Sequence, residues 1–89
     1  MGESHASRRL RVSVLGATGS IGTNTLDVAA HHPERFEVVA LSAHSRVDEL
    51  LAQCRQWRPR WAAMSDVEAA QRLAVAVRAE GLPTEVLAG

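Results

Sequence analysis

Apolar residues recur along this chain in two alternating patterns. Short, nearly continuous apolar runs predict β-strands at residues 10–15, 36–42, 61–64 and 84–87. Between them, residues 20–31, 47–57 and 67–77 carry apolar side chains at helical spacing. The resulting order is β-α-β-α-β-α-β with short connections. It predicts an α/β fold, a Rossmann-like parallel sheet with flanking helices.

Polar residues mark the expected helix ends. Ser45 with Asp48, and Ser65 with Glu68, have the spacing of a capping box, in which two side chains bind free N–H groups at a helix start. Gly81 follows the last helical segment and is expected to close it. The helical apolar stripe is clearest in the middle segment, where it comprises Val47, Leu50, Leu51, Cys54 and Trp57.

The first apolar run has almost no polar interruption. Residues 10–15 therefore have the composition expected of a strand that is covered on both faces of a parallel sheet. The pattern leaves the place of the last strand open, because residues 84–87 can lie beside the first strand or beyond the third.

Three glycines follow the first strand at equal spacing. Gly16, Gly19 and Gly22 form G-x-x-G-x-x-G between that strand and the first helix. Such glycines allow a sharp turn, a close approach of an anion to the backbone, and close packing of the helix on the strand. The first N–H groups of a helix have no partner within it and can bind a phosphate. An ordinary tight turn is the alternative, but the strand before it and the helix after it favour a phosphate-binding turn.

The tip of the second strand carries a second signal. A site for NAD has an acidic residue there, which binds the ribose hydroxyls. Here the segment instead offers His44, Ser45 and Arg46, and the first carboxylate, Asp48, lies inside the next helix. A guanidinium binds a 2′-phosphate that a carboxylate would repel. The sequence therefore favours NADP(H) over NAD(H), with an exposed Arg46 in the first helical turn as the alternative.

Composition narrows the function further. The chain has 89 residues, 46% of them hydrophobic, and a formal net charge of zero, so charge gives no reason to expect nucleic acid or an anionic membrane as a partner. A single cysteine, Cys54, excludes an intramolecular disulfide, and no apolar run is long enough to span a bilayer. Residues 1–9 are small, polar and basic, which predicts a loose leader without a secretory signal. We expect a cytoplasmic protein.

Several residues that suggest chemistry have simpler interpretations. His31 and His32 are adjacent, so on a helix they point about 100° apart and are expected as an exposed pair at the helix end. Cys54 lies on the apolar stripe and is interpreted as a small core residue. Trp57 and Trp61 flank Arg-Pro-Arg, which resembles a stacking surface for nucleic acid, but their positions favour a core or subunit contact.

With these motifs in place, the chain resembles the N-terminal, NADPH-binding part of the 1-deoxy-D-xylulose 5-phosphate reductoisomerase family. The resemblance runs from about residue 11 to the end. The stretches that carry it are 15–22 (LGATGSIG), 25–28 (TLDV), 32–41 (HPERFEVVAL) and 84–89 (TEVLAG). It is far more specific than the glycine spacing alone.

The resemblance implies an enzyme that uses NADPH and a divalent metal (Mn or Mg). Such an enzyme rearranges and reduces a phosphorylated ketose to 2-C-methyl-D-erythritol 4-phosphate, in non-mevalonate isoprenoid biosynthesis. The positions that match the family's NADPH contacts are Thr18, Gly19, Ser20 and Ile21. After the second strand the family often has a glycine, a basic residue and an asparagine, where this chain has His44, Ser45 and Arg46.

The resemblance also implies that much of the enzyme lies elsewhere. Proteins of this family are several times longer, and their metal and substrate ligands lie beyond the matched part. We therefore expect residues 10–89 to form part of a dinucleotide-binding domain, with no catalytic or metal residue of its own and no activity alone. A homodimer is implied for the full-length protein. The alternatives are another reductase with a G-x-x-G-x-x-G turn, such as a semialdehyde dehydrogenase or a dihydrodipicolinate reductase, and a non-catalytic NADP-sensing module.

Overall fold

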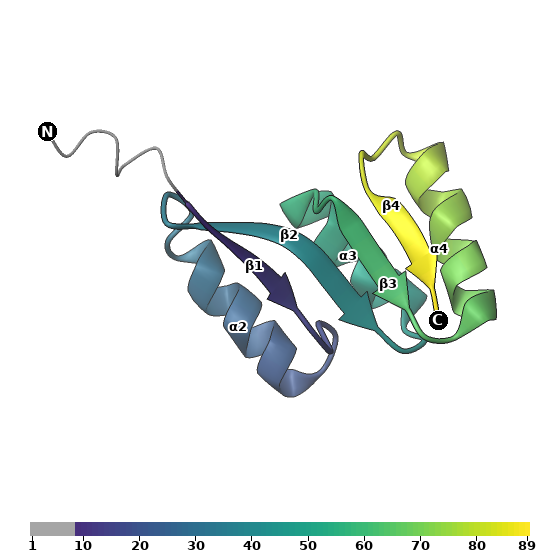
Figure 1. The fold of residues 1–89 in the computed structure, drawn as a ribbon, viewed down its shortest axis with the longest axis horizontal. Helices are drawn as coiled ribbons and strands as arrows, with labels where there is room; N and C mark the ends of the chain where they lie inside the picture. Colours follow the sequence, from purple (N-terminus) through teal and green to yellow (C-terminus); the bar gives the residue numbers. More distant parts are fainter. Residues whose placement is uncertain (1–8) are drawn as a thin grey trace, which may run out of the picture.

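The computed structural model describes residues 9–89, which form a single four-stranded sheet with three helices (Figure 1). The elements in chain order are β1 (Leu10–Val14), α2 (Ser20–Ala30), β2 (Phe36–Ala43), α3 (Val47–Trp57), β3 (Trp61–Met64), α4 (Val67–Ala79) and β4 (Glu85–Ala88). The predicted order of strands and helices and the α/β, Rossmann-like class are confirmed. Most of the expected leader, residues 1–8, lies outside the described residues.

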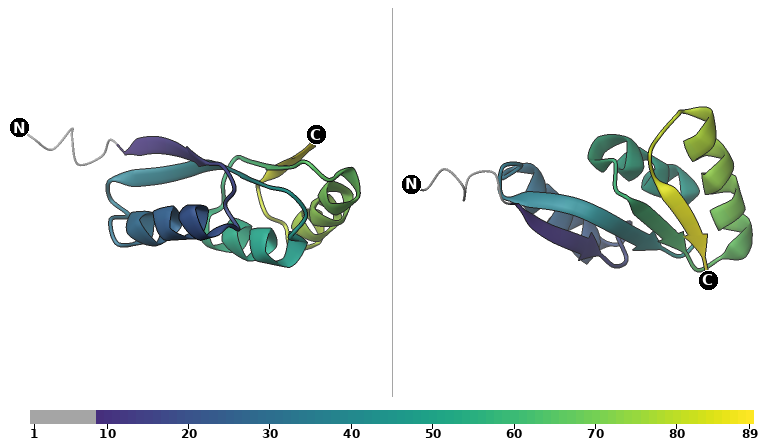
Figure 2. Two further views of the ribbon diagram at one scale, coloured as in Figure 1. Left: turned by 90° about the horizontal axis from the view of Figure 1, so that it is seen from below. Right: turned by 45° about the horizontal axis from the view of Figure 1, so that its top comes forward.

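All strand pairs are parallel, and the strand order is β1-β2-β3-β4. The last strand therefore lies beyond the third, and β1 is an edge strand of the described sheet. Each connection steps to the next strand in the same direction, so right-handed crossovers bring the three helices to one face. Figure 2 shows α2, α3 and α4 together beneath the sheet, with the opposite face free of helices.

The expectation that the first strand is covered on both faces is wrong for the described residues. Val14 is buried against the helices, whereas Arg11 and Ser13, which alternate onto the opposite face, are exposed. The physical reason is the topology: β1 has a strand on one side only, and helices cover one face only. Leu15, just after the strand, is 81% exposed.

The core lies between the sheet and the helices. Its largest fully buried side chains include Leu41, Leu50, Met64 and Leu73. The stripe of α3 is confirmed, because Leu50, Leu51 and Cys54 are buried, and Val47 and Trp57 at its ends pack against the core. Cys54 is fully buried, and this burial raises the pKa of its thiol, as expected of an inert core cysteine.

The capping box expected from Ser45 and Asp48 is wrong. The N-cap of α3 is Arg46, whose carbonyl accepts the N–H of Leu50 at 3.1 Å, and no side chain caps this end. The helix thus begins one residue later than the sequence pattern suggested, and neither side chain is in register with the free N–H groups. Asp48 lies in the first turn, where its charge suits the helix dipole.

The capping box at α4 is likewise shifted by one residue. Asp66, not Ser65, is the N-cap, and its carboxylate accepts the N–H of Ala69 at 2.9 Å. At the other end of α4, Gly81 has a φ of +67°, which confirms its expected place just after the helix.

An ion pair joins the outer sides of α3 and α4. Arg55 donates from Nε and Nη2 to the two carboxylate oxygens of Glu80, at 2.7 and 2.6 Å. The hydrogen bond from Arg55 lowers the pKa of the Glu80 carboxyl, and Glu80 in turn raises the pKa of the Arg55 guanidinium. Because the pair is exposed to solvent, we expect a modest contribution to stability.

This pair predicts a pH-dependent stability. A carboxyl with a lowered folded-state pKa contributes stability above its unfolded pKa and loses it as pH falls through the folded value. The difference in unfolding free energy between the parent chain and Glu80→Gln should therefore be greatest at neutral pH and vanish in acid, below the ordinary value of 4.5. Urea unfolding across this range measures it. Glu34→Gln makes the same charge change on an exposed turn. An equal response of both variants would contradict the assignment.

Candidate functional site

Open parallel sheets bind ligands beyond the carboxyl ends of their strands. Here the glycine turn follows β1, His44 follows β2 and Ser65 follows β3, so all three lie at this end. A shallow hollow of about 330 Å³ lies among them. Its lining residues are Gly16, Ser42, Ala43, His44, Ala63, Ser65 and Gly89.

The glycine turn is tied to the end of β2. Gly16 has a φ of +63°, a conformation that side chains disfavour, so the sharp turn needs glycine there. The N–H of Ala17 donates to the carbonyl of Ser42 at 2.7 Å, and the N–H of Gly16 donates to the Ser42 hydroxyl at 3.3 Å. The N–H of Gly19 donates back to the carbonyl of Gly16 at 2.9 Å, which closes the turn.

Gly22 allows the helix to begin against the turn. A Cβ at this position would lie 2.2 Å from the carbonyl oxygen of Gly16 and 2.8 Å from the Cα of Ala17, far inside van der Waals contact. At Gly19 a Cβ would be 3.4 Å from the nearest atom, the same Gly16 oxygen. Two of the three roles expected of these glycines are thus confirmed, the sharp turn at Gly16 and the close packing at Gly22. The role of Gly19 in anion approach stays a prediction.

Four backbone N–H groups of the glycine turn and the start of α2 donate no hydrogen bond within residues 9–89. Within residues 9–89, no hydrogen-bond acceptor faces the N–H of Thr18, Ser20, Ile21 or Gly22. They belong to the turn and the first turn of α2, where the positive end of the helix dipole also favours an anion. Of the predicted residues, Thr18, Ser20 and Ile21 therefore present free N–H groups side by side. Gly19 lies among them and has no side chain to obstruct a ligand.

Of the glycine turn, Gly16 lines the hollow of about 330 Å³ and Thr18, Gly19, Ser20 and Ile21 do not; the residues predicted at the tip of the second strand are also divided. His44 lines this hollow, and its Nδ1 lies 2.9 Å from the hydroxyl of Ser65. Ser45 instead faces a different hollow, beside α3 and α4. Arg46 pairs with Glu49 at 3.2 Å, and both side chains are more than half exposed. Because exposed ion pairs are weak, a phosphate can replace Glu49 as the partner of Arg46 at little cost.

Sequence reasoning missed two residues of this site. Ser42 holds the turn through its carbonyl and hydroxyl groups, as described above. Gln53 of α3 donates from Nε2 to the carbonyl of Ala17 at 2.8 Å, although 36 residues separate the two. Its Oε1 is buried without a partner among the described residues, an arrangement that costs about 1–3 kcal/mol. Nothing in the local sequence distinguishes Gln53 from other polar residues beside an apolar stripe.

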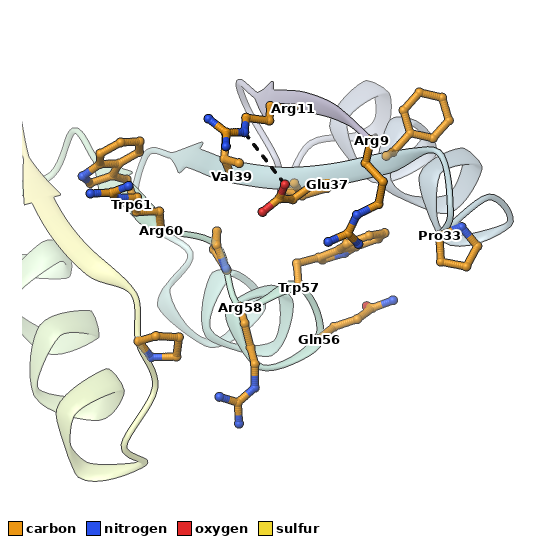
Figure 3. Close-up of a pocket in the computed structure, with 14 residues that line it drawn as sticks. Arg9, Arg11, Pro33, Glu37, Val39, Gln56, Trp57, Arg58, Arg60 and Trp61 are labelled. Carbon is orange, nitrogen blue, oxygen red and sulfur yellow. Dashed lines mark ion pairs between the residues drawn. The ribbon is translucent and has the colours of Figure 1, made fainter. Parts of the chain in front are cut away.

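A larger hollow of about 670 Å³ lies at the opposite end, near the amino ends of the strands (Figure 3). It is lined by several arginines, but they do not converge on one point. Arg11 lies 3.9 Å from Glu37, the Arg60 guanidinium lies 4.9 Å from the centre of the Trp61 ring, and Arg58 points away. Trp61 is 37% exposed, so a core role is wrong for it, and a subunit contact stays a prediction.

The described residues do not fit a metal ion. Within residues 9–89, no three His, Cys, Asp or Glu side chains lie close enough to hold one. His31 and His32 are exposed near the end of α2, as expected, and the Nδ1 of His31 lies 2.7 Å from the carbonyl of Asp27. No helix in this part of the chain is long and apolar enough to cross a membrane.

Comparison with known proteins decides the family. The family model described as 1-deoxy-D-xylulose 5-phosphate reductoisomerase matches residues 12–89, which include the glycine turn and all strands but the start of β1. The chain belongs to the 1-deoxy-D-xylulose 5-phosphate reductoisomerase family. The resemblance seen in the sequence is thus confirmed, and it disfavours the other reductases that share this glycine spacing.

Relatives in this reductoisomerase family are much longer than the chain. A Pseudomonas putida reductoisomerase is 54% identical over 83 residues, which make up 93% of this chain and 21% of that protein. A crystal structure of a reductoisomerase with NADPH, fosmidomycin and magnesium has a TM-score of 0.86 and 39% identity, over 90% of this chain and 19% of that one. The Zymomonas mobilis enzyme with NADPH has a TM-score of 0.85 and 34% identity, over 92% and 21%. The chain spans about a fifth of the length of these relatives.

Two glycine substitutions should show that Gly22 is needed for packing and Gly19 is not. Gly22→Ala forces the Gly16 carbonyl and the helix start apart, so we expect a loss of about 1–3 kcal/mol in unfolding free energy. Gly19→Ala meets only one atom, at 3.4 Å, and should keep nearly parental stability. Thermal and urea unfolding of both variants measure the difference. Equal destabilisation would contradict the separate roles.

Proposed function

We propose that this chain is the part of an NADPH-dependent reductoisomerase that binds the adenosine and pyrophosphate end of NADPH. The observation that carries the proposal is the set of free N–H groups at Thr18, Ser20 and Ile21, at the carboxyl end of the sheet. Membership of the reductoisomerase family and the NADPH in two related crystal structures support it.

Each part of the proposed site has a distinct role. The N–H groups of Thr18, Ser20 and Ile21 bind the pyrophosphate, and Gly19 leaves room for its oxygens. Arg46 binds the 2′-phosphate in exchange for Glu49, and Ser45 and His44 contact the same end of the cofactor. Bound NADPH supplies the hydride for a reduction.

The proposed reaction of the whole enzyme converts 1-deoxy-D-xylulose 5-phosphate to 2-C-methyl-D-erythritol 4-phosphate. It is a rearrangement followed by reduction, in non-mevalonate isoprenoid biosynthesis, and it uses a divalent metal, Mg or Mn. The described residues offer no metal cluster, so we assign the metal and the sugar phosphate to other parts of the enzyme.

Exposed apolar residues support the proposal that other parts of the enzyme pack against this chain. Leu15 is 81%, Leu87 44% and Trp61 37% exposed, on or next to a sheet that has helices on one face only. A sheet face without helices that carries several such residues is typical of a surface that other polypeptide covers. We therefore propose that the isolated chain is marginally stable. We also propose that it is inactive alone and that the whole enzyme is a cytoplasmic homodimer.

The first test is cofactor preference. Calorimetric titration of the chain should show tighter binding of NADPH than of NADH. Arg46→Ala should reduce that preference by about five- to tenfold, because it removes a charge-assisted contact with the 2′-phosphate. Arg35→Ala, an exposed arginine at the other end of β2, is the matched control. An unchanged preference in Arg46→Ala would show that the 2′-phosphate binds elsewhere.

The second test is activity. In a chimera, this chain replaces the corresponding fifth of the Pseudomonas putida enzyme, to which it is 54% identical. We expect NADPH-dependent turnover of 1-deoxy-D-xylulose 5-phosphate by the chimera and none by the chain alone. Turnover by the chain alone would contradict the proposal. A folded chimera that binds NADPH without turnover would support a non-catalytic module instead.

A further inference from the structure

We propose that Gln53 is a positioning residue for the cofactor turn, which it orients through the carbonyl of Ala17. The inference rests on the proposed function, because it concerns how the turn is held ready for the pyrophosphate. Gln53 belongs to α3, whereas the turn connects β1 to α2. Its side chain extends from α3 to the turn, where Nε2 donates to the Ala17 oxygen at 2.8 Å.

The geometry of the peptide explains the effect on the ligand. The described chain has no cis peptide bond, so the carbonyl of Ala17 and the N–H of Thr18 point in opposite directions. While Gln53 holds the carbonyl toward α3, the Thr18 N–H is directed away from α3. That N–H is one of the free donors assigned to the pyrophosphate.

Gln53 is the main donor to this carbonyl. The hydroxyl of Thr23 is 3.5 Å from the Ala17 oxygen, but it is 2.7 Å from the carbonyl of Gly19, to which it donates its single proton. The N–H of Ile21, which an unbroken helix would direct to Ala17, makes no such bond. Without Gln53, the Ala17 carbonyl keeps only the more distant Thr23 hydroxyl as a donor among the described residues.

The unpaired oxygen of Gln53 argues against a purely structural role. Oε1 is buried and has no partner among the described residues, so the amide is not the side chain that stability alone would favour. Methionine has nearly the same length and no polar atoms to satisfy. A buried polar group that is only half satisfied is expected where it orients a binding element.

The charge of the side chain matters as much as its shape. At neutral pH, glutamate in place of Gln53 has the same length but only accepts hydrogen bonds, so it repels the Ala17 oxygen and an incoming phosphate. Once protonated, it regains a donor. Acid should therefore restore the hydrogen bond to Ala17 in Gln53→Glu, and with it the affinity for the cofactor.

The experiment measures NADP+ affinity by calorimetry in the parent chain, Gln53→Met and Gln53→Glu, with thermal unfolding as a check of the fold. We expect Gln53→Met to bind about three- to tenfold more weakly at nearly parental melting temperature, since it loses one hydrogen bond and one unpaired acceptor. We expect Gln53→Glu to bind about tenfold more weakly at pH 8 and within about twofold of the parent at about pH 4.3, where half of the glutamate side chains are protonated. NADP+ is used because it tolerates acid.

The control is Gln56→Glu, which makes the same charge change on the same helix without contacting the turn, and which should bind like the parent at both pH values. Equal affinity in the parent and both Gln53 variants would overturn the positioning role and leave the proposed function intact. A weakening of Gln53→Glu that does not recover in acid would also overturn it. Failure of the folded parent to bind NADP+ would instead refute the proposed function.

Discussion

The candidate site depends on how closely the first helix approaches the end of the first strand. At Gly22 the helix backbone lies so near the Gly16 carbonyl that any β-carbon would overlap it at 2.2 Å. This close approach places the start of α2 directly over the turn. The free N–H groups of Thr18, Ser20 and Ile21 then lie together where the helix dipole is most favourable to an anion. Without this contact the same donors would be dispersed.

The turn is held from the side of β2 and α3 as well. Ser42, at the end of β2, binds the backbone of Gly16 and Ala17, and Gln53 binds the Ala17 carbonyl from α3. The two ends of the sheet therefore differ in the groups that they offer to an anion. At the carboxyl end, backbone donors are fixed and unpaired. At the amino end, Arg11 in the larger hollow is already paired with Glu37, and Arg60 is stacked on Trp61.

Regular spacing explains which features were predictable from the sequence. The stripe through Leu50 and Cys54 and the glycine spacing are local patterns; the stripe was confirmed, and so were the tight turn and close helix packing that the glycines predict. The caps of α3 and α4 were misplaced by one residue, because several polar residues near each helix start compete for the position. The coverage of β1 was wrong, because apolar composition does not say which neighbours a strand has. Gln53 was missed, because its role depends on a contact between residues 36 positions apart.

We propose that the glycine turn, and not the larger hollow, binds the dinucleotide. Backbone amide NMR of the chain, titrated with NADP+, tests it most directly. If the turn binds the dinucleotide, the largest chemical-shift changes fall on Thr18, Ser20 and Ile21, and the amide signals of Arg58 and Trp61 do not move. Shifts concentrated at Arg58 and Trp61, with the turn unaffected, would contradict it.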